Sequence, residues 1–179
     1  MLRSQPRFRG CCALAVGPRA MNNTNDKPLY LEDLHVGQRF TSGSYYIDED
    51  RMKAFAAEFD PQPFHVDEAA AKKSIFRGLA ASGWHTAAAT MRLLVTGALQ
   101  FANGIVGLGG EVSWPKPTRP GDTLRVESEI LEIIPSRSKP DRGVVIVRTV
   151  TLNQNDEQVQ LLTAKLLVFK RSFDPQVSV

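Results

Sequence analysis

The residues best suited to chemistry are Asp60 and His65, which flank two prolines within the segment 59–67. On a regular strand, residues five positions apart lie about 16 Å from each other. Pro61 and Pro63 prevent a regular path, so the carboxylate and the imidazole can converge on one point. An acid and an imidazole around one water molecule can move two protons in one step. The structural alternative is that Asp60 ends a helix and His65 is a packed core residue.

A second feature lies where a long apolar helix is expected to begin, at Ser82, Gly83 and Trp84. The first turn of a helix leaves backbone N–H groups free and carries the positive end of the helix dipole. A glycine at this point lets a ligand carbonyl approach the backbone. The arrangement is that of an oxyanion hole, which would stabilise an enolate. Ordinary capping by Ser82 and close packing of Gly83 on a sheet explain the same residues equally well.

The elements that position these residues follow from periodicity and turn signals. We expect a first strand within Tyr30–Tyr46, a helix from Asp48 to Phe59, and an irregular, extended loop over the prolines. Asp67 is expected to cap a short helix, Glu68–Lys73. The longest helix is expected from roughly Gly83 to Phe101, and because it is apolar nearly all round it should be buried.

The rest of the chain reads as strands. Short turns separate four of them, at Gly107–Trp114, Thr123–Pro135, Val144–Asn153 and Gln158–Lys170. The order of elements predicts an α+β fold in which an antiparallel sheet wraps around one long central helix. An open edge on a sheet of about five strands favours a homodimer, or an assembly of dimers, that pairs edges.

Composition restricts the class of protein. The chain has 179 residues, 42% of them hydrophobic and 23% charged, which fits one soluble globular domain. No run approaches the roughly 18 apolar residues of a membrane span. The net charge of +3 arises from four arginines in residues 1–21, and the remainder carries 18 basic and 19 acidic residues. A nucleic-acid or membrane partner is therefore not expected.

The N-terminal segment has three interpretations. Its arginine-rich, acid-free composition is typical of an organellar transit peptide, and the apolar stretch Cys11–Gly17 resembles a short secretory segment. It is equally an upstream extension, with Met21 as the working start, and the protein would then be cytoplasmic. Both cysteines, Cys11 and Cys12, lie here, which excludes a disulfide framework and a four-ligand zinc site. We expect an extension over residues 1–28, a domain over 29–172 and a tail over 173–179.

Together the motifs resemble those of the MaoC-like hydratases, a family that includes R-specific enoyl-CoA hydratases and has the hot-dog fold. The family motif Asp-x-Asn-Pro-x-His, followed by Asp, stands here as residues 60–65 with Asp67 behind. The family glycine that opens the central helix is Gly83. The later family pattern, an aromatic residue before a proline-rich link and Pro-Gly-Asp, appears at residues 114–122. The resemblance covers about Tyr30 to Lys170.

The resemblance implies a lyase that adds water reversibly to a trans-2-enoyl thioester and gives a (3R)-3-hydroxyacyl thioester, as in fatty acid metabolism. No metal or redox cofactor is implied, because coenzyme A or the phosphopantetheine arm of an acyl carrier is part of the substrate. The alternatives are a hot-dog acyl-CoA thioesterase and a non-catalytic acyl-thioester-binding subunit. The implied catalytic residues are Asp60, His65 and Gly83, and the implied substrate-binding residues are Gln62, Pro63, Phe64, Ser82, Trp84 and His85.

Two positions depart from the family pattern. Gln62 replaces the usual asparagine, and Ser82 replaces a histidine that commonly precedes the glycine. Some relatives also carry a serine on the central helix near the acid–imidazole pair, where this chain has Met91 beside Thr90. His85 either packs or lines the site. Basic residues between His65 and Gly83 either meet the coenzyme's phosphates or form a solvated surface; they are Lys72, Lys73 and Arg77.

Overall fold

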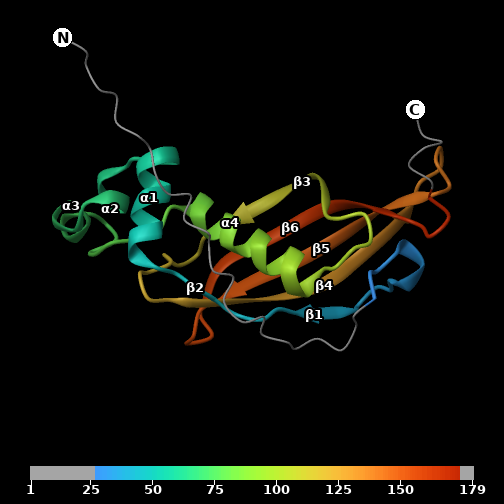
Figure 1. Ribbon diagram of the computed structural model, residues 1–179, viewed down its shortest axis with the longest axis horizontal. Coiled ribbons are helices and arrows are strands. Elements are labelled where there is room, and N and C mark those ends of the chain that lie inside the picture. Colours follow the sequence, from blue (N-terminus) through green and yellow to red (C-terminus); the bar gives the residue numbers. More distant parts are fainter. Residues whose placement is uncertain (1–26, 174–179) are drawn as a thin grey trace, which may run out of the picture.

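The computed structural model describes residues 27–173, so the expectations for the N-terminal extension and for the tail after residue 173 lie almost entirely outside it. A six-stranded sheet and a set of helices make up this part of the chain (Figure 1). The strands are β1 (Arg39–Thr41), β2 (Tyr45–Tyr46), β3 (Val106–Ser113), β4 (Thr123–Pro135), β5 (Arg142–Leu152) and β6 (Gln158–Phe169). The helices are α1 (Glu49–Phe59), α2 (Pro63–Val66), α3 (Glu68–Lys73) and α4 (Gly83–Leu93), with short irregular helices at Leu31–Asp33 and Leu94–Ala98.

The sheet is antiparallel with the order β1-β4-β5-β6-β3, and β2 pairs with the start of β4. Buried residues alternate along β4 and β5, as expected for strands with one face on the core. Leu124, Val126 and Ile130 of β4 and Val145 and Val147 of β5 fill that core. The sheet curves around α4, and α1–α3 gather at one end of it (Figure 1). The predicted architecture, a sheet wrapped around a central helix, is confirmed.

The central helix is shorter and less buried than the sequence predicts. It begins at Gly83, but after Leu93 it widens into a π-helical turn and ends at Ala98 rather than near Phe101. The helix stops because Gln100 and Ala102 exchange backbone hydrogen bonds with Leu29 instead of continuing the helical ladder. One face lies open to solvent in the monomer; it carries Trp84, Met91 and Val95.

The proline segment is also more regular than the predicted extended loop. Pro63 occupies the first position of α2, where its missing N–H costs nothing and its fixed φ suits a helix. Asp48 caps α1 and Asp67 caps α3, both as predicted, and each carboxylate accepts a backbone N–H of the first turn. Pro61 thus ends one helix and Pro63 begins the next, which leaves Asp60 to Gln62 as a sharp corner.

The N-terminal strand of the prediction is divided into β1 and β2. Gly37 adopts a left-handed φ of 82°, and its N–H donates to Ile130, which starts the pairing of β1 with β4. The interruption between β1 and β2 falls at Ser42, whose N–H and hydroxyl both bond to the backbone of Val126. One backbone bond and one side-chain bond of Ser42 therefore replace the regular ladder between β1 and β2.

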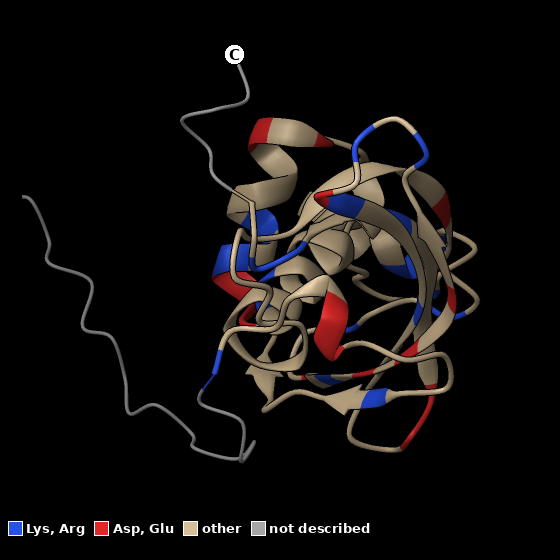
Figure 2. Cartoon of the chain, turned by 90° about the vertical axis from the view of Figure 1, so that its right-hand side faces the viewer, with Lys and Arg blue, Asp and Glu red and all other residues tan. Residues whose placement is uncertain are grey.

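Charged residues are dispersed over this frame. Figure 2 shows the lysine and arginine segments interspersed with aspartate and glutamate segments over both the sheet and the helices. Ion pairs link many of them, for example Arg148 with Glu129 across β5 and β4 at 2.7 Å. No helix within residues 27–173 has both the length and the apolar character that crossing a bilayer requires.

Candidate active site

Asp60 and His65 meet at the corner between α1 and α2. Two backbone hydrogen bonds fold the chain back on itself here, from Gln62 N–H to the Asp60 carbonyl (2.7 Å) and from His65 N–H to the Gln62 carbonyl (2.9 Å). As a result Asp60 Oδ2 lies 3.4 Å from His65 Nε2. The predicted convergence of the two side chains is confirmed. The imidazole is buried, whereas the Asp60 side chain keeps 19% of its surface exposed.

The orientation of the His65 ring is fixed from behind. Its Nδ1 lies 2.7 Å from the carbonyl oxygen of Ala80. Because a carbonyl can only accept, Nδ1 carries the hydrogen, and in the neutral form of the ring the unprotonated nitrogen is then Nε2, which faces Asp60. The ring of Phe64 packs edge-on against it, with centroids 4.5 Å apart. His65 is therefore held with its basic nitrogen facing the carboxylate.

Two side chains hold Asp60 in its ionised form. The Ser82 hydroxyl donates to Asp60 Oδ2 at 2.6 Å, and the Gln62 amide donates to Oδ1 at 2.8 Å. The Ser82 hydrogen bond is the largest of the causes that lower the pKa of Asp60 below its ordinary value, and the Gln62 bond adds to it, although partial burial acts in the opposite direction. Asp60 is consequently a carboxylate at neutral pH, ready to accept a hydrogen bond.

The N-terminus of α4 adjoins this pair through Ser82. The Ser82 oxygen that serves Asp60 also accepts the Trp84 N–H (3.2 Å), while the Ser82 carbonyl accepts the Thr86 N–H (3.1 Å). Among the described residues, the Gly83 N–H donates to no neighbour. The first turn of a helix of this length offers such a group to a polarised oxygen. Gly83 therefore presents a free donor one residue away from the side chain that binds Asp60.

Packing explains why residue 83 is a glycine. A Cβ added there would lie 2.9 Å from two atoms of the Trp114 indole, which covers this turn of the helix. The indole N–H of Trp114 donates to Gln160 Oε1 at 2.8 Å, and Gln160 itself is buried. Trp84 meets the same indole edge-on at 5.5 Å and remains 61% exposed. Close packing thus accounts for the glycine, and its free N–H is a separate property.

The remaining predicted residues are spread around the site. Pro63 and Gln62 are exposed at the corner, and Phe64 packs on His65. The His85 ring is buried and stacks on Phe55 of α1 at 4.8 Å, and its Nδ1 has no hydrogen-bond partner among the described residues. Burial lowers the pKa of His85. Packing is thus the role of His85 that the structure displays.

Other side chains near the site bond to partners of their own or face solvent. The hydroxyl beside the acid–imidazole pair comes from Ser82 and not from the middle of α4, because Thr90 bonds to Thr151 at 2.7 Å and Met91 faces solvent. Lys72 is committed to an ion pair with Glu68 at 2.8 Å on the helix surface. The described residues contain no cluster of three or more His, Cys, Asp or Glu side chains that could hold a metal ion.

Sequence reasoning missed the groups that support the site from distant parts of the chain. The Ala80 carbonyl that orients His65 leaves no trace in residue type, and Gln160 lies 46 positions from the tryptophan that it holds. Trp114, in contrast, could be recognised from the sequence, because it is the aromatic residue that precedes the proline-rich link in the family pattern.

The comparisons with known proteins assign the family. The family model described as MaoC like domain matches residues 32–154. The chain belongs to the MaoC-like family. It is 60% identical to a MaoC-like dehydratase from Rhodospirillum rubrum of known structure, over 81% of this chain and 99% of that one, with a TM-score of 0.80. It is also 34% identical over 130 residues to the uncharacterized protein YdeM of Bacillus subtilis, which covers 72% of this chain and 91% of that protein.

A further MaoC-like neighbour is the R-hydratase PhaJ1 from Pseudomonas aeruginosa, at 26% identity and a TM-score of 0.64 over 85% of this chain and 97% of that one. These likenesses confirm the predicted hot-dog fold and the family resemblance. The MaoC-like family comprises hydratases and dehydratases, which supports a lyase in general.

Proposed function

We propose that this MaoC-like protein is an enoyl-thioester hydratase, which adds water reversibly to a trans-2-enoyl-CoA and forms a (3R)-3-hydroxyacyl-CoA. One observation carries the proposal: an Asp60 carboxylate oxygen lies 3.4 Å from His65 Nε2, the nitrogen that carries no hydrogen in the neutral ring when Nδ1 donates to Ala80. Two acceptors at this separation can both contact one water molecule at ordinary hydrogen-bond lengths. A water held in this way is polarised for attack on carbon.

The reaction balances without any other reactant. The water oxygen bonds to the β-carbon of the enoyl group as one water proton passes to the Asp60–His65 pair. The pair then delivers a proton to the α-carbon from the same face, which gives syn addition and returns both side chains to their starting protonation states. The reverse sequence removes water from the 3-hydroxyacyl thioester.

The thioester carbonyl gains negative charge as the β-carbon is attacked. In our proposal it accepts a hydrogen bond from the Gly83 N–H, at the positive end of α4. The Ser82 hydroxyl keeps Asp60 and this helix terminus side by side, because it bonds to both. The water at the Asp60–His65 pair and the thioester carbonyl at Gly83 would thus be held next to each other.

Relatives support the substrate class. A 70-residue stretch is 43% identical to a mesaconyl-CoA hydratase of Cereibacter sphaeroides and spans 38% of this chain and 20% of that protein. Coenzyme A or an acyl carrier arm would be part of the substrate, and no separate cofactor is proposed.

We further propose that two copies pair through β3. Within the described residues β3 pairs only with β6, and its other edge is open. Nearly every β3 residue is exposed, including Val106 and Leu108, and the exposed apolar residues Met91 of α4 and Val95 of the turn that follows it are also available. A second copy of the chain would satisfy this edge and cover these apolar side chains. Light scattering should give twice the chain mass, and Leu108→Lys should shift it toward the monomer.

The test of activity uses purified protein with short and medium trans-2-enoyl-CoA substrates. Loss of the conjugated enoyl absorbance and release of free thiol are followed in parallel. Asp60→Asn and His65→Ala should each lower the rate of hydration about 10²–10⁴-fold. Asp67→Asn is the matched control, because it removes a carboxylate from the same loop while asparagine still caps α3.

Thiol release without loss of the conjugated double bond would replace the hydratase with a thioesterase. Acyl-CoA binding without turnover of either kind would make the chain a binding subunit. Hydration that survives both Asp60→Asn and His65→Ala would refute the assignment of the site.

A further inference from the structure

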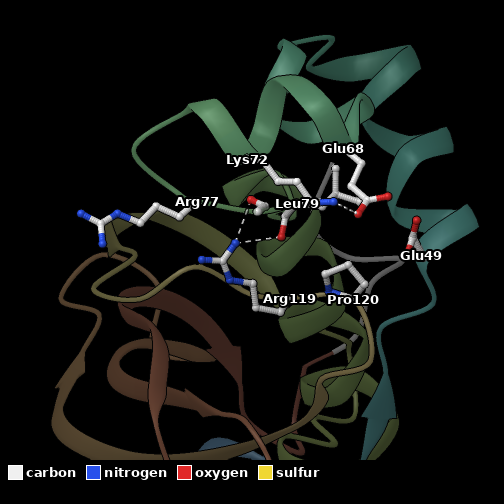
Figure 3. Close-up of a pocket in the computed structure, with 8 residues that line it drawn as sticks. Glu49, Glu68, Lys72, Arg77, Leu79, Arg119 and Pro120 are labelled. Atoms are coloured by element: carbon white, nitrogen blue, oxygen red, sulfur yellow. Dashed lines mark hydrogen bonds and ion pairs between the residues drawn. The ribbon is translucent and has the colours of Figure 1, made fainter.

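The guanidinium of Arg119 binds three successive parts of one loop. It donates to the carbonyls of Phe76 (2.6 Å), Gly78 (2.9 Å) and Leu79 (2.9 Å). Figure 3 shows the Arg119 side chain reaching from the β3–β4 link toward the Leu79 carbonyl. The backbone of Arg119 is itself fixed, because its N–H donates to Asp122 at 2.7 Å. A buried or half-buried charge-assisted bond of this kind is stronger than a bond between neutral groups.

The loop held by Arg119 leads directly to the group that orients His65. The next residue after Leu79 is Ala80, whose carbonyl accepts the Nδ1 hydrogen of His65. The Phe76 ring, at the start of the same loop, packs against Phe64 with centroids 5.1 Å apart and lies 6.3 Å from the His65 ring. Arg119 therefore fixes the backbone at both places where the loop meets His65 and its neighbour.

In the described part of the chain, no nearby carboxylate competes with the loop for the Arg119 guanidinium. Arg119 lines an open cavity of about 350 Å³ together with Glu49, Glu68 and Lys72 (Figure 3). Both carboxylates already have other cations as partners: Glu68 pairs with Lys72 at 2.8 Å, and Glu49 pairs with Lys53 at 2.6 Å. The three hydrogen bonds of the Arg119 guanidinium thus all go to the loop.

We infer that Arg119 is a positioning residue for His65. It holds the loop 76–80 so that the Ala80 carbonyl keeps the hydrogen on Nδ1 and leaves Nε2 free to act on water. The effect of Arg119 on turnover rests on the proposed function. Its effect on the tautomer of the His65 ring does not, because the tautomer can be measured without a substrate. Lysine cannot replace the planar fork, since an ammonium on a flexible stem does not reach three carbonyls in fixed directions.

The first test is spectroscopic. The chain contains three histidines, and a His65→Gln sample identifies the His65 signals in ¹⁵N-histidine-labelled protein. At about pH 8.5, where unperturbed imidazoles are neutral, wild-type His65 should show a protonated Nδ1 and an unprotonated Nε2. Arg119→Ala and Arg119→Lys should show a mixture of the two tautomers, and guanidinium ion should restore the single tautomer in Arg119→Ala. A folded variant with the wild-type His65 signals would overturn the inference.

The second test is kinetic. In the hydration assay, Arg119→Lys should lower kcat about 10–100-fold while KM changes less than about threefold, and guanidinium should recover part of the loss in Arg119→Ala. Adding Arg119→Lys to His65→Ala should cause no further loss, because the loop would have no ring to orient. Multiplicative losses in the double variant would contradict the inference and indicate a general structural role.

Arg142→Ala is the control for lost arginine contacts. Arg142 donates two bonds to Asp141 at the start of β5, so its removal should lower stability and leave kcat unchanged. If wild-type protein lacks hydratase activity but the His65 tautomer still depends on Arg119, the proposed function fails and the positioning role stands. If hydration is observed and the tautomer does not respond to Arg119, the positioning role fails alone.

Discussion

A methyl group at Gly83 should push the Trp114 indole away from the start of α4. The added Cβ would lie 2.9 Å from Cδ2 and Cε2 of the indole, about 0.5 Å inside the 3.4 Å at which ordinary contact begins. The indole cannot retreat freely, because Gln160 holds its N–H and Trp84 lies against its edge. Overpacking of this kind costs about 1–3 kcal/mol. For a domain of this size, the melting temperature of Gly83→Ala should fall by about 3–10 °C.

The assay is a double-mutant cycle. The variants Gly83→Ala, Trp114→Leu and their combination are unfolded in urea, and the free energy of unfolding is compared with that of wild type. Trp114→Leu removes the ring that clashes, so the double variant should be more stable than the sum of the single changes predicts, by at least about 1 kcal/mol. Gly97→Ala is the control, because its nearest neighbours lie at 3.4 Å, and its effect should stay within about 1 kcal/mol.

If the losses in the free energy of unfolding are additive, the added methyl group does not clash with the indole. The packing argument for a glycine at position 83 would then be wrong. The hydration assay separates packing from chemistry in the same proteins. If the Gly83 N–H takes no part in the reaction, the double variant should recover activity along with stability. If the N–H polarises the thioester, misplacement of this turn should leave kcat low even where stability returns.

Three other perturbations test the site and its supports. Ser82→Ala removes the bond that lowers the pKa of Asp60, so that pKa should rise, the acid limb of kcat/KM should move to higher pH, and Ser82→Thr, which keeps a hydroxyl, should move it less. Thr90→Val should cost about 1–3 kcal/mol in urea unfolding by leaving Thr151 without its partner, whereas the double change to valine should recover most of the loss. Burial lowers the pKa of His85, so its protonation favours the unfolded chain, and stability should decline as the pH falls below about 6.5. His85→Phe should flatten that decline in urea unfolding, and an unchanged profile would show that another group titrates.

The sequence predicted those features that local chemistry controls. Prolines at 61 and 63 signalled the corner that joins Asp60 to His65, and the capping residues Asp48 and Asp67 marked helix starts correctly. The end of the central helix was predicted poorly, because it depends on backbone pairing with Leu29, which lies about 70 residues earlier in the chain. A periodic pattern describes side chains and carries no information about distant backbone partners.

The same distinction applies to the candidate site. The reacting groups of the proposal carry recognisable side chains, whereas their supports are a backbone carbonyl at Ala80 and a side chain at Arg119 from 39 residues further along. Ser82 was predicted to touch substrate, and its bond to Asp60 was not foreseen from the sequence. Long-range contacts of this type follow from the folded sheet order, which residue types alone do not specify.

The Ser82 hydroxyl belongs to two equilibria at once. It accepts the Trp84 N–H, which resists fraying of the first turn of α4, and it donates to Asp60, which sets the proton affinity of that carboxylate. Thermodynamic linkage then requires that each process influence the other by the same free energy. Amide hydrogen exchange at Trp84 would therefore quicken when Asp60 takes up a proton and slow when a bound molecule holds the carboxylate ionised. The exchange rate of the Trp84 amide would therefore measure whether Asp60 is protonated, ionised or bound to a ligand.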